Sequence, residues 1–469
     1  MSSQSITTLY RKMCFEFGDD TVIKSTTAEY GYSEIYEVAN ILVKQLHHRF
    51  NVTSNDYVLI DCTTTDSDSD SDSDATNTDM SHLELPAILA CIHLGVPFVP
   101  ISCSTLHQPP RLSALVAALK RTGSQVYGII HATSDASPLV TALHAATVHR
   151  LLYLDSAGSV IETIQTIDIL PDPVYNEALY VMFTSGTSGT PKAVVGSHAA
   201  TVNRLAWWHD TFPATYSSRT VIARRSPLTF VDGLNDLLAG CLFPNTTVFQ
   251  GVEDLGGHGV SRVTVLPQQL ALLTASPPSR TLKHVIVSGS LLTAEQVSCY
   301  NSNGWRHVPL INLYGQTETG GDVLYNVVGS GGGFNEITGC DVRVEDGEIV
   351  VAGVCCAVGY LGKAKFEGFY RTGDCGTVVD DRVVVGGRLD GVGKVNGIVT
   401  CPREVETVFQ HHLEVKCTAT VEGGVVAVRV EEEVGEGWRG RLRERGVPWH
   451  LIPRTIVGGT GAGRVTASR

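Results

Sequence analysis

Near the start of the chain, apolar residues first recur at the spacing of a helix and then form the short run of a strand. Within residues 32–50, one helical face is apolar, comprising Ile35, Val38, Ala39, Leu42, Val43 and Leu46. Residues 57–60 follow as a short apolar run that favours a strand. Residues 83–102 repeat this order, with an apolar helix, a stop at Gly95 and a strand closing at Pro100. This alternation predicts an α/β domain with a largely parallel sheet.

The parallel pattern continues to about residue 320 and then changes. Before that point, residues 263–275 and 284–297 each combine a β-rich run with a helix. Residues 339–362 and 376–391 are short strands separated by Asp-Gly, Asp-Asp and Gly-Gly turns, which predict an antiparallel region. Beyond it we expect a smaller segment, with a helix over residues 402–412 and then a β-hairpin.

Composition places the chain among globular proteins. Its 469 residues are 43% hydrophobic and 18% charged, enough for two or three domains. The net charge is 35 − 48 = −13, so no basic surface for nucleic acid is expected. Residues 63–79 are a Ser/Thr/Asp repeat too polar to bury, which predicts a disordered surface insertion. It is either a solvated loop or an acidic target for a serine kinase.

Targeting signals are not evident in the sequence. The first twenty residues lack the apolar core of a signal peptide, and no run of about 18 apolar residues could span a membrane. Twelve irregularly spaced cysteines, without the spacing of metal ligands, are typical of reduced thiols. These features predict a soluble, cytoplasmic protein with no membrane span.

Residues 180–195, "YVMFTSGTSGTPKAVV", place small hydroxyl residues and glycines after an apolar run. Backbone N–H groups and hydroxyls of such a loop can approach an oxyanion, because no bulky side chain intervenes. Lys192 would add a positive charge. The loop is not a Walker loop, because Pro191 and Ala193 flank the lysine where that motif requires glycine and a hydroxyl residue. Taken alone, the pattern leaves open a flexible turn or a phosphate-binding loop.

Four motifs in order settle this choice: "FTSGTSGTPKAVV", "NLYGQTET", "YRTGD" and "GRLDGVGKVNG". Together they resemble the core motifs of the adenylate-forming superfamily, which comprises acyl-CoA synthetases, luciferases and nonribosomal-peptide adenylation domains. The resemblance covers nearly the whole chain. Residues 202–213 and 226–240 are most similar to its stand-alone branch of β-alanine-activating, aminoadipate-semialdehyde-dehydrogenase-like proteins.

The resemblance implies both a fold and a reaction. We expect a large N-terminal domain over residues 1–389, made of α/β layers plus a small β-barrel. A small, mobile α+β domain over residues 390–469 would follow a hinge at Asp390. The implied enzyme is an AMP-forming acid–thiol ligase that uses ATP and Mg²⁺. A small carboxylic or amino acid is converted to acyl-AMP with release of pyrophosphate, and a thiol then displaces AMP.

The thiol acceptor follows from the same resemblance. No carrier segment with a phosphopantetheine serine follows Arg469 in the sequence. We therefore expect the acceptor to be either CoA or the phosphopantetheine of a separate carrier protein.

The resemblance also implies individual roles. The loop that holds the β- and γ-phosphates matches Thr184, Ser185, Gly186, Thr187, Ser188, Gly189 and Lys192. Tyr314 matches the aromatic residue that stacks on adenine, and Thr317 the hydroxyl at the α-phosphate. Glu318 matches the carboxylate that holds Mg²⁺, since a carboxylate would otherwise repel the triphosphate. Asp374 matches the acid that binds both ribose hydroxyls, and Arg388 a basic residue near ribose and phosphate.

Three positions leave alternatives open. Arg464 matches the position of the family's C-terminal lysine. Its planar guanidinium group is not equivalent to the ammonium group of a lysine. Lys394 matches the lysine of the thiol-transfer step, or is a surface lysine. Asp232 lies one residue beyond the usual ammonium-binding acid, so it meets a more distant amine, such as that of β-alanine, or caps a helix. The altered C-terminus keeps open an alternative function, a degenerate protein that binds ATP or AMP as a sensor or interaction partner.

Overall fold

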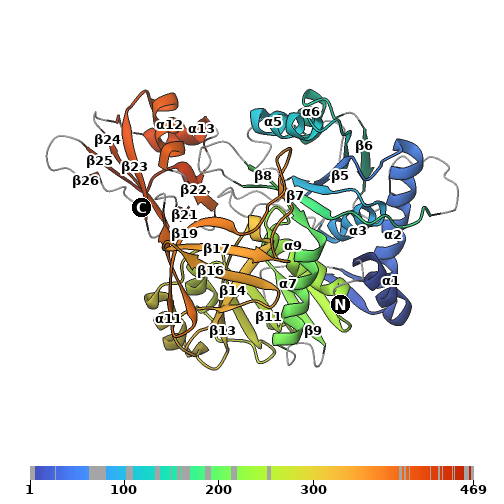
Figure 1. Ribbon diagram of the computed structural model, residues 1–469, viewed down its shortest axis with the longest axis horizontal. Coiled ribbons are helices and arrows are strands. Elements are labelled where there is room, and N and C mark those ends of the chain that lie inside the picture. Colours follow the sequence, from blue (N-terminus) through green and yellow to red (C-terminus); the bar gives the residue numbers. More distant parts are fainter. Residues whose placement is uncertain are drawn as a thin grey trace.

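Figure 1 shows the protein as a computed structural model. The structure describes residues 6–26, 28–62, 81–101, 109–131, 138–148, 150–155, 160, 170–184, 192–212, 219–250, 255–389, 393–395, 398–400, 402–422, 424–430, 434–435, 437–445, 447, 449–458 and 464–465. The predicted acidic insertion at residues 63–79 lies outside these ranges. Two large sheets with helices between and around them form most of the molecule (Figure 1).

The first large sheet has seven strands in the order β18-β8-β7-β4-β3-β5-β6. Its strands are β3 (Tyr57–Asp61), β4 (Phe98–Ile101), β5 (Val126–His131), β6 (Leu151–Leu154), β7 (Ala178–Thr184), β8 (Lys192–Ser197) and β18 (Gly359–Tyr360). The strands from β7 to β6 pair in parallel. At the other edge, β8 and β18 are antiparallel to their neighbours.

The second large sheet has nine strands in the order β15-β14-β13-β12-β11-β9-β10-β1-β2. Its strands are β1 (Thr21–Ser25), β2 (Glu29–Gly31), β9 (Thr220–Arg224), β10 (Thr246–Gln250), β11 (Arg262–Val265), β12 (His284–Val287), β13 (Leu310–Gln316), β14 (Gly321–Val327) and β15 (Asn335–Glu336). Pairing is parallel from β1 to β13 and antiparallel at both edges. The predicted α/β class is confirmed.

An apolar core joins the two sheets. Val58 and Ile60 of β3 belong to it together with Val248 of β10. Helices α1 (Ile6–Phe17), α2 (Tyr32–Lys44), α3 (Glu84–Leu94) and α9 (Val231–Leu242) also contribute to this core. Every residue of α3 is buried, and the helix ends at Gly95, whose φ of 64° is the left-handed geometry of a helix C-terminus. The predicted helix and its glycine stop are therefore confirmed.

The outer faces of the sheets have their own covering helices. Leu59 of β3 points away from Val58 and Ile60, because side chains alternate along a strand, and it packs with α5 (Pro109–Lys120) and α6 (Pro138–Ala145). On the second sheet, α10 (Leu270–Leu273) and α11 (Ala294–Tyr300) cover the outer face. Helix α7 (His198–Thr211) follows β8 directly. The short helical segments are η1 (Gln45–Arg49), η2 (Ser81–Leu83), η3 (Pro267–Gln269), η4 (Asn301–Trp305), η5 (Thr317–Thr319) and η6 (Trp449–Leu451).

An antiparallel sheet of four strands follows, in the region where the sequence predicts a small β-barrel. Its strands are β16 (Cys340–Glu345), β17 (Glu348–Gly353), β19 (Tyr370–Val379) and β20 (Arg382–Arg388). Asp346 and Gly347 connect β16 to β17 with φ values of 51° and 79°. Positive φ at both central residues is the geometry that an Asp-Gly hairpin turn requires, as the sequence predicts.

The C-terminal elements have a separate apolar core. They are β21 (Gly393–Val395), β22 (Ile398–Thr400), α12 (Pro402–Leu413), β23 (Cys417–Glu422), β24 (Val425–Val430), α13 (Trp438–Glu444), β25 (Thr455–Gly458) and β26 (Arg464–Val465). Within the described ranges, this core contains residues from Val395 to Ile456 alone. The predicted helix and hairpin are confirmed, whereas the proposed hinge residue Asp390 lies outside the described residues.

The helix predicted over residues 32–50 is only partly α-helical. The apolar pattern over residues 32–50 predicts one helix, but the α-helix ends at Lys44 and continues as the π-helical segment η1. In the parts of the chain that the structure describes, no helix has the length and apolar character needed to cross a membrane.

Candidate active site

The hairpin of β13 and β14 forms the centre of the site. The chain reverses through η5, so that Tyr314, Thr317 and Glu318 follow one another around the turn. This reversal needs Gly315, because a Cβ there would lie 1.9 Å from the carbonyl oxygen of Gly321. The two strands thus approach more closely than any side chain at position 315 permits.

Asp374 lies opposite this hairpin and accepts hydrogen bonds from three side chains. The Tyr314 hydroxyl donates to Oδ2 over 2.6 Å, and Gln316 Nε2 donates to the same oxygen over 2.7 Å. Arg388 Nη1 lies 3.3 Å from Oδ1, and Asp374 and Arg388 are cross-strand neighbours on β19 and β20. Burial, and then the charge of Asp374, raise the pKa of Tyr314, so its hydroxyl remains a donor. The structure therefore brings together three of the predicted residues.

Glu318 forms a second group with Tyr360 and Lys192. The Tyr360 hydroxyl donates to Glu318 Oε1 over 3.1 Å, and Lys192 Nζ lies 5.4 Å from the centre of the Tyr360 ring. Tyr360 is held there because β18 pairs with β8, which begins at Lys192. Burial, followed by the charge of Glu318, raises the pKa of Tyr360 to about 12. Lys192 is also the cross-strand neighbour of Thr184, so both ends of the predicted phosphate loop lie here.

Tyr370 connects the two groups. Its hydroxyl donates to Gln316 Oε1 over 3.3 Å, and its ring packs against Phe366, which in turn contacts the ring of Tyr360. The pKa of Tyr370 is raised by burial and then by the charge of Glu318. A continuous set of polar and aromatic side chains therefore extends from Asp374 to Glu318.

The residues around Glu318 fit a magnesium ion bound together with a nucleotide. Glu318 is 8% exposed, and among the described residues only its Oε1 accepts a hydrogen bond. Mg²⁺ is commonly held by one or two carboxylates together with substrate phosphates, and not by a cage of protein ligands. The described residues contain no group of three or more His, Cys, Asp and Glu side chains arranged for a metal.

Asp232 lies in the first turn of α9, away from the nucleotide motifs in sequence. The N-cap residue of this helix is Phe230, which has no side-chain acceptor, so the alternative that Asp232 caps the helix is wrong. Burial is the main reason why the pKa of Asp232 is raised, and the nearby charge of Asp322 adds to it. Asp232 therefore belongs to a buried polar environment between α9 and β14.

The remaining predicted residues are placed only in part. Lys394 lies on β21, where it pairs with Val399, and Arg464 lies on β26, where it pairs with Val457; in both cases the backbone alone is described. No described contact brings either of them to Asp374 or Glu318. Of the loop residues predicted to hold phosphate, the structure describes Thr184 and Lys192. The other loop residues lie outside the described ranges: Ser185, Gly186, Thr187, Ser188 and Gly189.

The family model described as AMP-binding enzyme matches residues 78–361. The chain belongs to the AMP-binding enzyme family. The matched range contains the predicted phosphate loop and the hairpin of Tyr314 and Glu318, and it ends just after Tyr360.

Relatives of this AMP-binding chain include long synthetases. Vanchrobactin synthetase VabF of Vibrio anguillarum is 26% identical over 382 residues, which cover 62% of this chain and 13% of that protein. Zwittermicin A synthase ZmaJ of Bacillus cereus is 26% identical over 311 residues, covering 55% of this chain and 57% of the relative. The chain thus spans less than two thirds of the length of these relatives.

Solved structures show the same fold over nearly the whole AMP-binding chain. The o-succinylbenzoate CoA synthetase MenE of Bacillus subtilis, bound to a product analogue, matches with a TM-score of 0.77 and 17% identity. The match covers 98% of this chain and 96% of that one. Other structures of the same synthetase contain ATP with a magnesium ion, or the acyl-adenylate OSB-AMP.

Three side chains of the site were missed by the sequence analysis of this AMP-binding chain. Gln316 and Tyr370 lie inside the motifs "NLYGQTET" and "YRTGD", so their positions in those motifs could have identified them. Tyr360 lies in "VGYLG", which has no comparable signal. Its position depends on the pairing of β18 with β8, which links segments about 165 residues apart.

Proposed function

We propose that the chain activates a carboxylic or amino acid with ATP to give an acyl-adenylate and pyrophosphate. A thiol, of CoA or of a carrier protein's phosphopantetheine, then takes the acyl group and releases AMP. The observation that supports this most is the continuous set of side chains from Asp374 through Gln316 and Tyr370 to Glu318. Such a set offers an acceptor for a ribose and a carboxylate for a phosphate-bound cation at its two ends.

Asp374 is the proposed ribose ligand. A carboxylate offers about four acceptor positions, and Tyr314 and Gln316 occupy those of Oδ2. One hydroxyl of a ribose can donate to the free position of Oδ1. The second requires that Arg388 move away, and its 3.3 Å bond is the longest of the three. The ring of Tyr314 would then stack on adenine.

The phosphates are proposed to lie between Glu318 and Lys192. Thr317 would hold the α-phosphate, and Lys192 with the loop from Thr184 to Gly189 would hold the β- and γ-phosphates. Mg²⁺, when bound, would supply positive charge that offsets the charge developing on pyrophosphate. The acid's carboxylate oxygen forms a bond to the α-phosphorus while the bond to pyrophosphate breaks. Lys192 is thereby placed to stabilise the leaving group.

The C-terminal residues are proposed to act after or during this step. Arg464 would bridge the attacking carboxylate and the phosphate, and Lys394 would act during thiol transfer, after a rotation at Asp390. The domain limits of 1–389 and 390–469, the β-alanine-activating branch and a cytoplasmic location remain proposals from the sequence. The self-contained core from Val395 to Ile456 supports the two-domain division.

The test is ATP–pyrophosphate exchange with Mg²⁺ over α-amino, β-amino, short and aryl acids. Exchange with an acid is expected, and Lys192→Ala should lower its rate about 100-fold or more, because a cation at the leaving group is lost. Lys365→Ala is the matched control, since Lys365 forms an exposed ion pair with Glu177. Arg464→Ala should lower exchange while ATP binding is retained.

The alternative function makes the opposite prediction. A degenerate protein would bind ATP or AMP without exchange for any acid, and the observation that favours it is arginine at position 464. Nucleotide binding by calorimetry together with no exchange would support the alternative and contradict the proposed reaction. Detection of an acyl-AMP would exclude the alternative.

A further inference from the structure

An open hollow lies at one edge of the first large sheet, where the parallel strands β3, β5 and β6 begin. It is lined by residues from Arg49 to Asp56, which precede β3, by Gln125 and Tyr127 at the start of β5, and by Arg150 just before β6. The predicted phosphate loop follows β7, at the opposite, carboxyl edge of the same parallel strands. The volume of the hollow is about 710 Å³, within the range of about 300–1,000 Å³ for small-molecule pockets. The hollow is therefore a candidate ligand site apart from the nucleotide motifs.

Two stacked rings form a wall of the hollow. The ring centroids of Phe50 and Tyr127 are 5.8 Å apart, with 17° between the ring planes. The Tyr127 hydroxyl also donates to the Phe50 carbonyl over 3.3 Å. Tyr127 is 2% exposed and belongs to the core between the sheets, so the ring pair is anchored to β5. A wall that is fixed in this way does not have to be ordered when a ligand binds.

Each of the two rings contacts one guanidinium group. Arg49 Cζ lies 5.3 Å from the centre of the Phe50 ring, and Arg150 Cζ lies 5.7 Å from the centre of the Tyr127 ring. Arg150 Nη1 also donates to the Tyr127 hydroxyl over 3.2 Å. A ring attracts a cation, but it does not offer the oxygen acceptors that pair with the N–H groups of a guanidinium. Arg150 is therefore held in place with N–H donors still available.

The carboxylate in the hollow does not neutralise these cations. Asp56 is 7% exposed, and its Oδ2 accepts hydrogen bonds from the backbone N–H and the hydroxyl of Thr53 over 2.9 and 2.8 Å. Its Oδ1 accepts one from the backbone N–H of Gln125 over 2.8 Å. Among the described residues, Arg150 has polar contacts with Tyr127 alone and forms no ion pair. The hollow thus has an excess of positive charge in a chain whose net charge is −13.

This lining favours an anionic ligand. A guanidinium without a carboxylate partner attracts an anion, and its planar fork matches two oxygens of a phosphate or a carboxylate. The exposed side chains of Asn51 and Gln125 add amide groups that can bond to hydroxyls. A metal ion is a poor fit, because both oxygens of Asp56 are already engaged. An apolar ligand would cover charged groups without pairing them, which costs free energy.

We propose that this hollow binds a small organic phosphate, with Arg150 as the main phosphate ligand and Arg49 as a second cation. Phosphate is favoured over a carboxylate, because a group with nearly two negative charges gains more from two guanidinium groups than a single charge does. The hollow is larger than a phosphate ion alone requires, so an organic part has room beside Phe50. The site is separate from the proposed active site, and the inference does not depend on the proposed function.

The experiment measures the binding of three probes by isothermal titration calorimetry: 3-phosphoglycerate, fructose 1,6-bisphosphate and inorganic phosphate. None of them contains adenine or a triphosphate, so they are poor ligands for the proposed nucleotide site. At least one organic phosphate should bind with one site per chain, and should bind at least about tenfold more tightly than inorganic phosphate and than its unphosphorylated form, glycerate or fructose. Its affinity should fall as the salt concentration rises.

Substitutions of Arg150 locate the bound probe. Arg150→Gln should weaken the binding of the best probe about 10- to 100-fold, because hydrogen bonds between two charged groups are lost. Arg150→Lys should weaken it less, since the charge is kept while the planar fork is lost. Arg150 is exposed, so both variants should retain the wild-type melting temperature.

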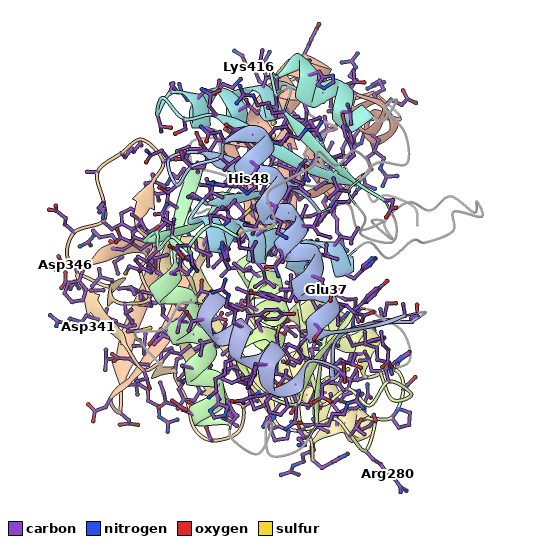
Figure 2. The ribbon with its side chains drawn as sticks, turned by 90° about the vertical axis from the view of Figure 1, so that its right-hand side faces the viewer. Glu37, His48, Arg280, Asp341, Asp346 and Lys416 are labelled. Atoms are coloured by element: carbon purple, nitrogen blue, oxygen red, sulfur yellow. The ribbon has the colours of Figure 1, made fainter. Side chains whose placement is uncertain are left out.

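Arg280→Gln is the matched control. Arg280 is also an exposed arginine, and Figure 2 shows it at an end of the molecule away from His48, the residue that precedes Arg49. This variant should bind the probe as the wild type does. Lys192→Ala, which alters the predicted phosphate loop, should also bind it unchanged.

Three outcomes overturn the inference: neither organic phosphate binds more tightly than inorganic phosphate, Arg150→Gln binds the best probe as the wild type does, or Lys192→Ala loses the binding. In the last case the probe occupies the predicted phosphate loop and not the hollow. Each of these outcomes leaves the proposed function standing, because pyrophosphate exchange is measured separately. Conversely, a chain that exchanges no acid is still expected to bind the probe in this hollow.

Discussion

The carboxylate of Asp374 accepts hydrogen bonds from side chains of both β13 and β20. Asp374→Asn replaces one carboxylate oxygen with an NH₂ group, which faces donors and cannot accept from a ribose. Hydrogen bonds to charged groups contribute about 1.5–3 kcal/mol each, so AMP affinity should fall about 10- to 100-fold. Isothermal titration with AMP measures this. Asp341→Asn is the control, and equal affinity in both variants would contradict the ribose assignment.

His198 makes stability depend on pH. The residue is 6% exposed, its Nδ1–H donates to the Asn176 carbonyl over 2.9 Å, and its Nε2 has no partner among the described residues. Burial lowers the pKa of His198 from 6.5 to about 4, although the Asn176 carbonyl opposes this. The folded state therefore resists protonation that the unfolded chain accepts. This contribution is present above pH 6.5 and is lost as the pH falls toward 4.

The expected loss is about 3 kcal/mol in the free energy of unfolding between pH 6.5 and pH 4. His198→Gln cannot be protonated, so its stability should fall less steeply over this range than that of the wild type. His307→Gln, at an exposed position, should retain the wild-type slope. Urea unfolding at several pH values provides the measurement, and equal slopes in all three proteins would show that His198 is not the cause.

At the scale of the element, the β13–β14 hairpin positions the site through its backbone. Gly315→Ala would place a methyl group 1.9 Å from the Gly321 carbonyl oxygen and 2.4 Å from Cα of Asp322. The strands must separate, so the free energy of unfolding should fall by more than about 3 kcal/mol and AMP affinity should fall with it.

A second glycine, Gly332, provides the control for this prediction. Gly332 has no atom within 4 Å of an added Cβ, so Gly332→Ala should leave both stability and AMP affinity near the wild-type values. Urea unfolding and AMP titration of both variants test the prediction. A stable, AMP-binding Gly315→Ala protein would show that the hairpin tolerates a wider separation.

At the scale of the whole molecule, the proposed nucleotide-binding residues and the C-terminal elements belong to different cores. Tyr314, Asp374 and Arg388 all precede residue 390, whereas the core from Val395 to Ile456 follows it. A chain of residues 1–389 should therefore unfold cooperatively and bind AMP as the full chain does. It should lose pyrophosphate exchange, because Lys394 and Arg464 are removed. Thermal unfolding, AMP titration and exchange measure these properties, and an unfolded fragment would contradict the two-domain division.

Patterns that are local in the chain were read correctly from the sequence. Alternating and helical spacings predicted β3, α3 with its Gly95 stop, α12 and the β23–β24 hairpin, because burial of one face imposes such spacings on neighbouring residues. The motifs predicted that Tyr314, Glu318 and Asp374 belong to one site, with roles at adenine, Mg²⁺ and ribose. The π-helical continuation of α2 was not predicted, because apolar spacing alone does not distinguish i+4 from i+5 hydrogen bonding.

The sequence by itself determined which residues have the chemistry for a nucleotide site, and in which class of fold they lie. Only the tertiary structure decided that Tyr314 bonds to Asp374, 60 residues away, and that Tyr360 reaches Glu318. It alone also placed the half-buried Asp232 near the buried carboxylates of Asp322 and Asp236. The physical reason is that such contacts depend on strand order and register, which bring distant segments together and which no local pattern of residues encodes.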